Sequence, residues 1–161
     1  MGGNFIIFQW NARGIRSNGH ELVQYVHNIN KKPHAICVQE TFLPPGEVYN
    51  IPNYIGIFKP RVSGSHGGCA IYVNTSISYK EVDTPPNKEF QKIVIKGCSI
   101  EFVVINFYNP CLNISNDFLS SVINDCGQSF KLCSDFITST PITPYGDQKR
   151  STKMVGKLKY S

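Results

Sequence analysis

The apolar positions of the chain fall in short runs whose spacing changes along the sequence. Two β-rich runs, Phe5–Trp10 and Ala35–Val38, enclose a stretch of helical spacing, which indicates a strand, a helix and a second strand in a βαβ-like unit. Asn18, with Glu21 three residues later, resembles a capping box. We therefore expect the helix to begin there and to end before Pro33.

From residue 54 onwards the pattern changes to strands without intervening helices. The candidate strands are Tyr54–Lys59, Cys69–Asn74, Ile77–Val82, Gln91–Lys96 and Ser99–Tyr108. A tight turn at Lys96–Cys98 makes the last two a β-hairpin, whereas the proline-rich segment Thr41–Tyr54 is expected to be irregular. A helix at Asp117–Cys126, stopped by Gly127, and a strand at Phe130–Phe136 complete the prediction.

Length and composition favour one folded domain. The 161 residues are 41% hydrophobic and only 17% charged, which excludes a fully disordered chain. We expect the domain to span residues 1–136, and residues 137–161 to form a disordered basic tail that holds five of the 16 Lys and Arg residues. Such a tail is either a solvated end or a weak attachment point for nucleic acid.

Cysteine usage indicates reduced thiols. The chain has six cysteines but no CxxC pair and no histidine at zinc-ligand spacing, and Cys37, Cys69 and Cys133 lie inside apolar runs as small core residues. With no recognisable signal peptide, this pattern indicates an intracellular protein. No apolar run approaches the roughly 20 residues that span a bilayer, so no membrane partner is expected.

Four polar residues stand at the ends of apolar runs: Asn11, Glu40, Tyr108 and Asp135. A carboxamide, two carboxylates and a phenol gathered at one edge of a sheet suit a hard metal ion and a phosphodiester. Each residue alone has an ordinary alternative, because Asn and Asp end strands, Glu decorates surfaces and Tyr fills cores.

The order of five segments adds to this pattern. The segments FQWNARGIRSNGHEL, AICVQETFL, HGGCAIYV, VVINFYNP and CSDF together resemble the endonuclease/exonuclease/phosphatase superfamily, and within it the apurinic-type endonuclease domain of jockey-like non-LTR retrotransposons. The resemblance spans residues 5 to about 136. It implies an α+β fold: a four-layer α/β-β/α sandwich of two mostly antiparallel sheets flanked by helices.

The resemblance also implies roles. Glu40 would hold Mg²⁺ or Mn²⁺, Asn11 would help to position the metal or the phosphate, Tyr108 would stabilise the phosphoryl transition state, and Asp135 would orient or activate the attacking water. The substrate would be DNA. In the ancestral element a downstream reverse transcriptase domain and the element RNA would be the partners, and the action would be nuclear.

The fourth segment departs from the family pattern. Ser134 stands where the family has Gly, Ile137 where it has Asn, and no histidine follows His66 to take the role of a late catalytic His. We therefore expect a C-terminally truncated, degenerate copy with an incomplete second half, impaired or absent activity and poor solubility.

Two other functions stay open. The chain could be a non-catalytic nucleic-acid-binding remnant that contacts phosphates through Arg13, Arg16, Lys59, Arg61 and the basic tail. It could also be a phosphatase of inositol phosphates or sphingolipids, although the WNARGI segment and the small size argue against that.

Overall fold

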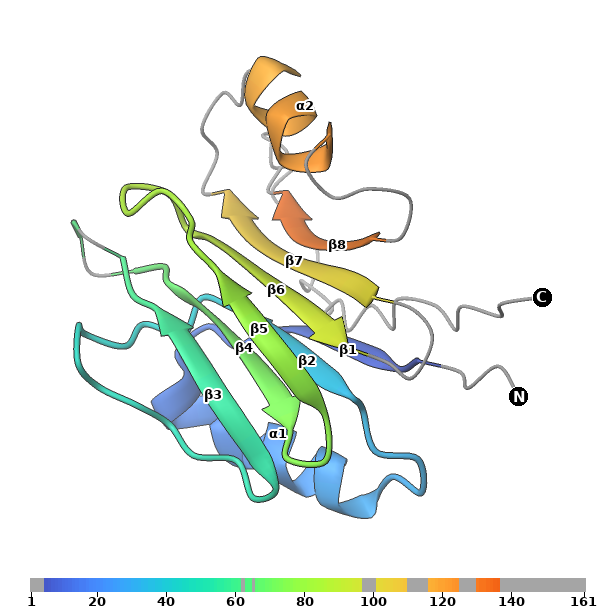
Figure 1. Cartoon of the computed structure of the whole chain (residues 1–161). Coiled ribbons are helices and arrows are strands. Elements are labelled where there is room, and N and C mark those ends of the chain that lie inside the picture. Colours follow the sequence, from blue (N-terminus) through green and yellow to red (C-terminus); the bar gives the residue numbers. More distant parts are fainter. Residues whose placement is uncertain are drawn as a thin grey trace, which may run out of the picture.

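The computed structural model describes residues 5–61, 63–64, 66–96, 101–109, 116–124 and 130–136. Within these ranges, eight strands form two four-stranded sheets that are stacked face to face, and two helices accompany them (Figure 1). The expected α+β class, with mostly antiparallel sheets flanked by helices, is confirmed.

The first sheet contains the βαβ unit. Its elements are β1 (Ile7–Asn11), α1 (Ile15–Asn28), β2 (Ala35–Gln39), β3 (Tyr54–Lys59) and β4 (Cys69–Asn74). The strand order is β1-β2-β4-β3, in which β1 and β2 are parallel and the other pairs antiparallel. The predicted strand–helix–strand opening is therefore confirmed.

The second sheet also has four strands with one parallel pair, which here is formed by its last two strands in the sequence. Its elements are β5 (Ser78–Val82), β6 (Phe90–Lys96), β7 (Glu101–Asn109), α2 (Asn116–Asn124) and β8 (Phe130–Phe136). The order is β5-β6-β7-β8, and the only parallel pair in the described part of this sheet is β7 with β8. In both sheets a helix connects the parallel pair, as a crossover requires.

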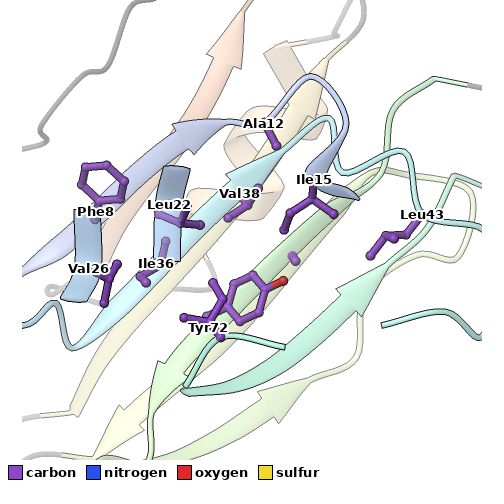
Figure 2. Packing of buried hydrophobic residues seen from close by; sticks show 11 residues of the cluster. Phe8, Ala12, Ile15, Leu22, Val26, Ile36, Val38, Leu43 and Tyr72 are labelled. Carbon is purple, nitrogen blue, oxygen red and sulfur yellow. The ribbon is translucent and has the colours of Figure 1, made fainter. Parts of the chain in front are cut away.

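Alternation along the strands builds three apolar layers. On β2, Ile36 and Val38 face α1, whereas Ala35 and Cys37 face the second sheet. Figure 2 shows the layer under α1, which contains Phe8, Ala12, Ile15, Leu22, Val26, Ile36, Val38, Leu43 and Tyr72. The layer between the sheets contains Ile7, Ala35, Cys37, Ile71, Val73, Ile93, Ile95, Phe102 and Val104. The third layer joins Phe90, Val103, Ile105 and Phe107 to α2.

Helix α1 begins earlier than the sequence predicts, and the predicted capping box is wrong. Its N-cap is Gly14, which makes no side-chain cap. Backbone carbonyls take over that function, because the Gly14 and Ile15 N–H groups donate to the carbonyls of Glu40 and Thr41 at 2.9 and 3.0 Å. Asn18, now inside the first turn, donates through Nδ2 to the Ala12 carbonyl at 2.8 Å. The chain after β2 thus satisfies donors that would otherwise be unpaired.

Several sequence predictions fall outside the described residues. These are the turn at Lys96–Cys98, the stop at Gly127 and the basic tail at 137–161. Among the described side chains, Cys37 and Cys69 are buried free thiols, as expected of small core residues. Neither described helix has the length and apolarity that a bilayer crossing requires.

His34 joins the start of β1 to β2. The ring Nδ1 of His34 accepts a hydrogen bond from the Ile6 N–H at 2.9 Å, and the backbone N–H of His34 donates to the Ile6 carbonyl at 2.8 Å. The imidazole ring also stacks on Phe5. An accepting Nδ1 carries no proton, so this arrangement selects the neutral ring. Burial lowers the pKa of the imidazole from its usual 6.5.

This lowered pKa predicts acid sensitivity. Below pH 6.5 the unfolded chain binds a proton at His34 before the folded chain does, so the free energy of unfolding should fall as the pH drops from 6.5 towards the folded-state pKa. Urea unfolding of His34→Asn, which keeps an acceptor but cannot titrate, should show a flatter pH dependence than the wild type. Equal slopes for the wild type and His34→Asn would contradict the assignment.

Candidate active site

The space between the two sheets becomes polar at one end. Gln39 on β2 and Asn106 on β7 are fully buried, and Gln39 Nε2 donates to Asn106 Oδ1 at 2.6 Å. Asn106 Nδ2 donates in turn to the carbonyls of Val38 and Ala70, at 3.1 and 2.9 Å. Buried carboxamides are costly unless paired, so this set holds the sheets in one relative position.

Glu40 and Tyr108 lie just beyond this buried pair. Glu40 follows Gln39 at the end of β2, and Tyr108 stands two residues after Asn106 near the end of β7. The Tyr108 hydroxyl donates to Glu40 Oε1 at 3.0 Å. Two of the four predicted site residues, 68 positions apart, are thus in direct contact.

The backbone around Glu40 adopts an uncommon conformation. Glu40, Arg13 and Phe42 have positive φ angles of 52°, 45° and 54°, values that non-glycine residues seldom adopt. All three follow the ends of β1 or β2. Residues held in such conformations concentrate at functional sites, where surrounding contacts over-determine them.

The Tyr108 phenol is held in its protonated form. Burial first, and then the charge and hydrogen bond of Glu40, raise the pKa of Tyr108 above its usual value. The Glu89 carboxylate raises it further, and Arg61 opposes this effect. A phenol that keeps its proton at neutral pH is a hydrogen-bond donor to developing negative charge.

The other two predicted residues share this edge by backbone placement. Asn11 is the last residue of β1 and is paired in register with Gln39, one position before Glu40. Its Oδ1 accepts a hydrogen bond from the Arg13 N–H at 3.1 Å. Asp135 on β8 is in register with Tyr108 on β7, but its side chain lies outside the described ones. The strand ends therefore converge as expected, and the role of Asp135 stays a prediction.

The donors at this edge are compatible with a metal bound mainly by water and substrate. Among the described residues no three His, Cys, Asp or Glu side chains cluster around one point. Mg²⁺ needs only one or two carboxylates, with waters and substrate phosphates completing its shell. Glu40 and Asn11 offer oxygen atoms of the type that such an ion prefers.

The basic residues suggested as a phosphate-binding surface are largely engaged elsewhere. Arg16 is paired with Glu47, and Arg61 with Glu89. Lys59 Nζ donates to the carbonyl and hydroxyl of Thr84 at 3.3 and 3.2 Å. These pairings weaken the reading of the four residues as an open cationic patch.

Sequence reasoning did not assign roles to three residues of this region, Gln39, Asn106 and Glu89. Each stands in or beside an apolar run, where a polar residue needs a partner if it is buried. That signal marks such residues as unusual, but their partners are remote in sequence: Gln39 and Asn106 are 67 positions apart.

The sequence matches one family of known proteins. Residues 8–152 match the sequence profile of the Endonuclease/Exonuclease/phosphatase family. No curated protein matches the chain.

Solved structures share the fold at low sequence identity. The endonuclease domain of TRAS1, a telomere-specific non-LTR retrotransposon, aligns at 13% identity with a TM-score of 0.64, over 83% of this chain and 60% of that one. The AP endonuclease LMAP from Leishmania major aligns at 16% identity and a TM-score of 0.56, over 72% and 43%. The 3′ phosphatase NExo from Neisseria aligns at 14% identity and 0.52, over 82% and 57%. The chain thus spans between 43% and 60% of these three chains.

The buried carboxamide pair predicts a large loss of stability on truncation. Asn106→Ala removes both hydrogen-bonding groups and leaves Gln39 Nε2 buried without this acceptor, so the free energy of unfolding should fall by about 3 kcal/mol. Urea unfolding would measure the loss. Asn30→Ala, at an exposed position after α1, should change the value by less than about 0.5 kcal/mol. A change at Asn106 as small as that of the control would show that the pair does not hold the sheets.

Proposed function

Because the chain belongs to the endonuclease/exonuclease/phosphatase family, we propose that the edge formed by Glu40 and Tyr108 hydrolyses phosphodiester bonds of DNA with the help of Mg²⁺ or Mn²⁺. One observation carries the proposal: the Tyr108 hydroxyl donates to Glu40 Oε1 at 3.0 Å, across the ends of strands from different sheets. A carboxylate and a protonated phenol in contact are suited to bind a cation and to stabilise phosphoryl oxygens.

Glu40 and Asn11 would hold the metal ion. Asn11 ends β1 and Glu40 directly follows β2, and these two strands are parallel neighbours. Both residues therefore lie at the same edge of the first sheet. The bound ion would withdraw negative charge from the phosphoryl group.

Tyr108 and Asp135 would act on the reacting groups. The raised pKa of Tyr108 keeps its proton available for donation to a phosphoryl oxygen as negative charge develops there. Asp135, in register with Tyr108 on the neighbouring strand, would orient the attacking water and accept its proton.

The biological setting we propose is that of a non-LTR retrotransposon of the jockey type. The five-segment resemblance and the fold shared with the TRAS1 endonuclease domain support it. The nick would then be made in nuclear target DNA and would prime reverse transcription of the element RNA by a separate reverse transcriptase domain. Ser134 and Ile137 depart from the family pattern, so we expect hydrolysis to be slow.

A plasmid-nicking assay tests the function. The wild-type chain should convert supercoiled plasmid to the nicked form slowly in Mg²⁺ or Mn²⁺, and a chelator should stop the reaction. Glu40→Ala should lower the rate roughly 100-fold or more, because it removes the carboxylate of the proposed metal site. Glu101→Ala, which removes an exposed carboxylate at the far end of β7, is the matched control and should keep the wild-type rate.

Binding assays separate this function from that of a DNA-binding remnant. A chain that retains DNA in a salt-sensitive manner, and shows the same background nicking in the wild type and Glu40→Ala, would refute the nuclease and support the remnant. Arg16, Lys59 and Arg61 each contact another side chain of this chain, and we therefore favour the nuclease over the DNA-binding remnant.

A further inference from the structure

Glu89, just before β6, has a carboxylate with two committed partners. Glu89 Oε1 accepts a hydrogen bond from Arg61 Nε, and Oε2 accepts one from the Gly68 N–H at 2.7 Å. The Glu89 side chain is only 12% exposed. A largely buried carboxylate needs such partners, and here both come from the segment that precedes β4.

The two glycines of this segment leave room for the contact. A Cβ atom on Gly67 would lie 2.8 Å from both Glu89 carboxylate oxygens and 2.7 Å from Arg61 Nε. A Cβ atom on Gly68 would lie 2.8 Å from the Thr41 hydroxyl. Both positions also have positive φ angles, 127° and 79°, so the pair of glycines is required by space and by backbone conformation.

The glycine carbonyls hold the chain that follows Glu40. The Thr41 N–H donates to the Gly68 carbonyl at 3.1 Å, and the Phe42 N–H donates to the Gly67 carbonyl at 2.9 Å. These bonds restrain the segment that gives Glu40 its positive φ angle.

Glu89 also holds Tyr108 through its own backbone. The Tyr108 N–H donates to the Glu89 carbonyl at 3.0 Å. Glu89 therefore contacts Tyr108 directly, and it is connected to Glu40 through the two glycines.

We propose that Glu89 is a positioning residue for the phosphodiester hydrolysis. With Arg61 and the Gly67–Gly68 pair, it fixes the Glu40 carboxylate at hydrogen-bonding distance from the Tyr108 hydroxyl. The inference rests on the proposed function, and it gives Glu89 a role in positioning alone.

Kinetics of the full chain provide the first test. Glu89→Ala should lower kcat for plasmid nicking about 100-fold, the cost of a misplaced reacting group, with little change in KM for DNA. Ile95→Val, which removes one methyl group from the inter-sheet layer at the other end of β6, should keep the wild-type kcat. A Glu89→Ala kcat within twofold of that control would overturn the proposal.

The ionisation of Tyr108 provides a second test that needs no nuclease activity. In chains with ¹³Cζ-labelled tyrosine, assigned with Tyr108→Phe, a pH titration that extends well above the usual phenol pKa of about 10 reports the ionisation of Tyr108. By charge alone, Arg61→Ala should raise the pKa of Tyr108, since Arg61 lowers it. If the Arg61–Glu89 pair positions Glu40 against the phenol, Arg61→Ala and Glu89→Ala should both lower that pKa towards its usual value.

The two tests separate the two claims. A wild-type chain that does not nick DNA, but whose Tyr108 pKa falls in both variants, would refute the proposed function and support the positioning by Glu89. A Tyr108 pKa that rises or stays constant in Arg61→Ala would refute the positioning, whatever the nicking rate.

Discussion

The hydrogen bond between the buried carboxamides of Gln39 and Asn106 is the constraint on which the rest of the site depends. The apolar contacts between the sheets are not directional, so they would tolerate small sliding movements. A fully buried carboxamide pair does not tolerate such sliding, because a displaced donor or acceptor would lose its partner where no water can replace it. Glu40 and Tyr108 follow these residues by one and two positions, and they inherit their relative position from the pair.

The segment after β2 serves several purposes at once. The carbonyls of Glu40 and Thr41 accept the first N–H groups of α1, while the Thr41 and Phe42 N–H groups donate to Gly68 and Gly67. The same few residues thus start the helix, receive the glycine segment and present the carboxylate. This sharing explains how a glutamate can be kept at a positive φ angle without a glycine in its place.

The layout of the fold was predictable because it depends on local patterns. Alternation and turn residues located all eight strands to within two residues, and placed Asn11 and Glu40 at strand ends. The contacts that complete the site were not predictable from spacing. Helix α1 begins at Ile15 because the remote carbonyls of Glu40 and Thr41 accept the first N–H groups, and Glu89 meets Arg61 from 28 positions away. Pairings of this kind arise from the stacking of the sheets, for which one sequence has no periodic signal.

The long sequence separation within the site has a consequence for the order of folding. The described strands of the first sheet all lie before residue 75, whereas Tyr108 lies on β7, which pairs with β6 in the second sheet. Contacts between distant parts of a chain form late, since their loop-closure entropy must first be overcome. During synthesis on the ribosome, the first sheet would therefore exist for a time before Glu89 and Tyr108 reach the edge that holds Glu40. Competence for chemistry would arise in the final docking step, and not gradually as the chain emerges.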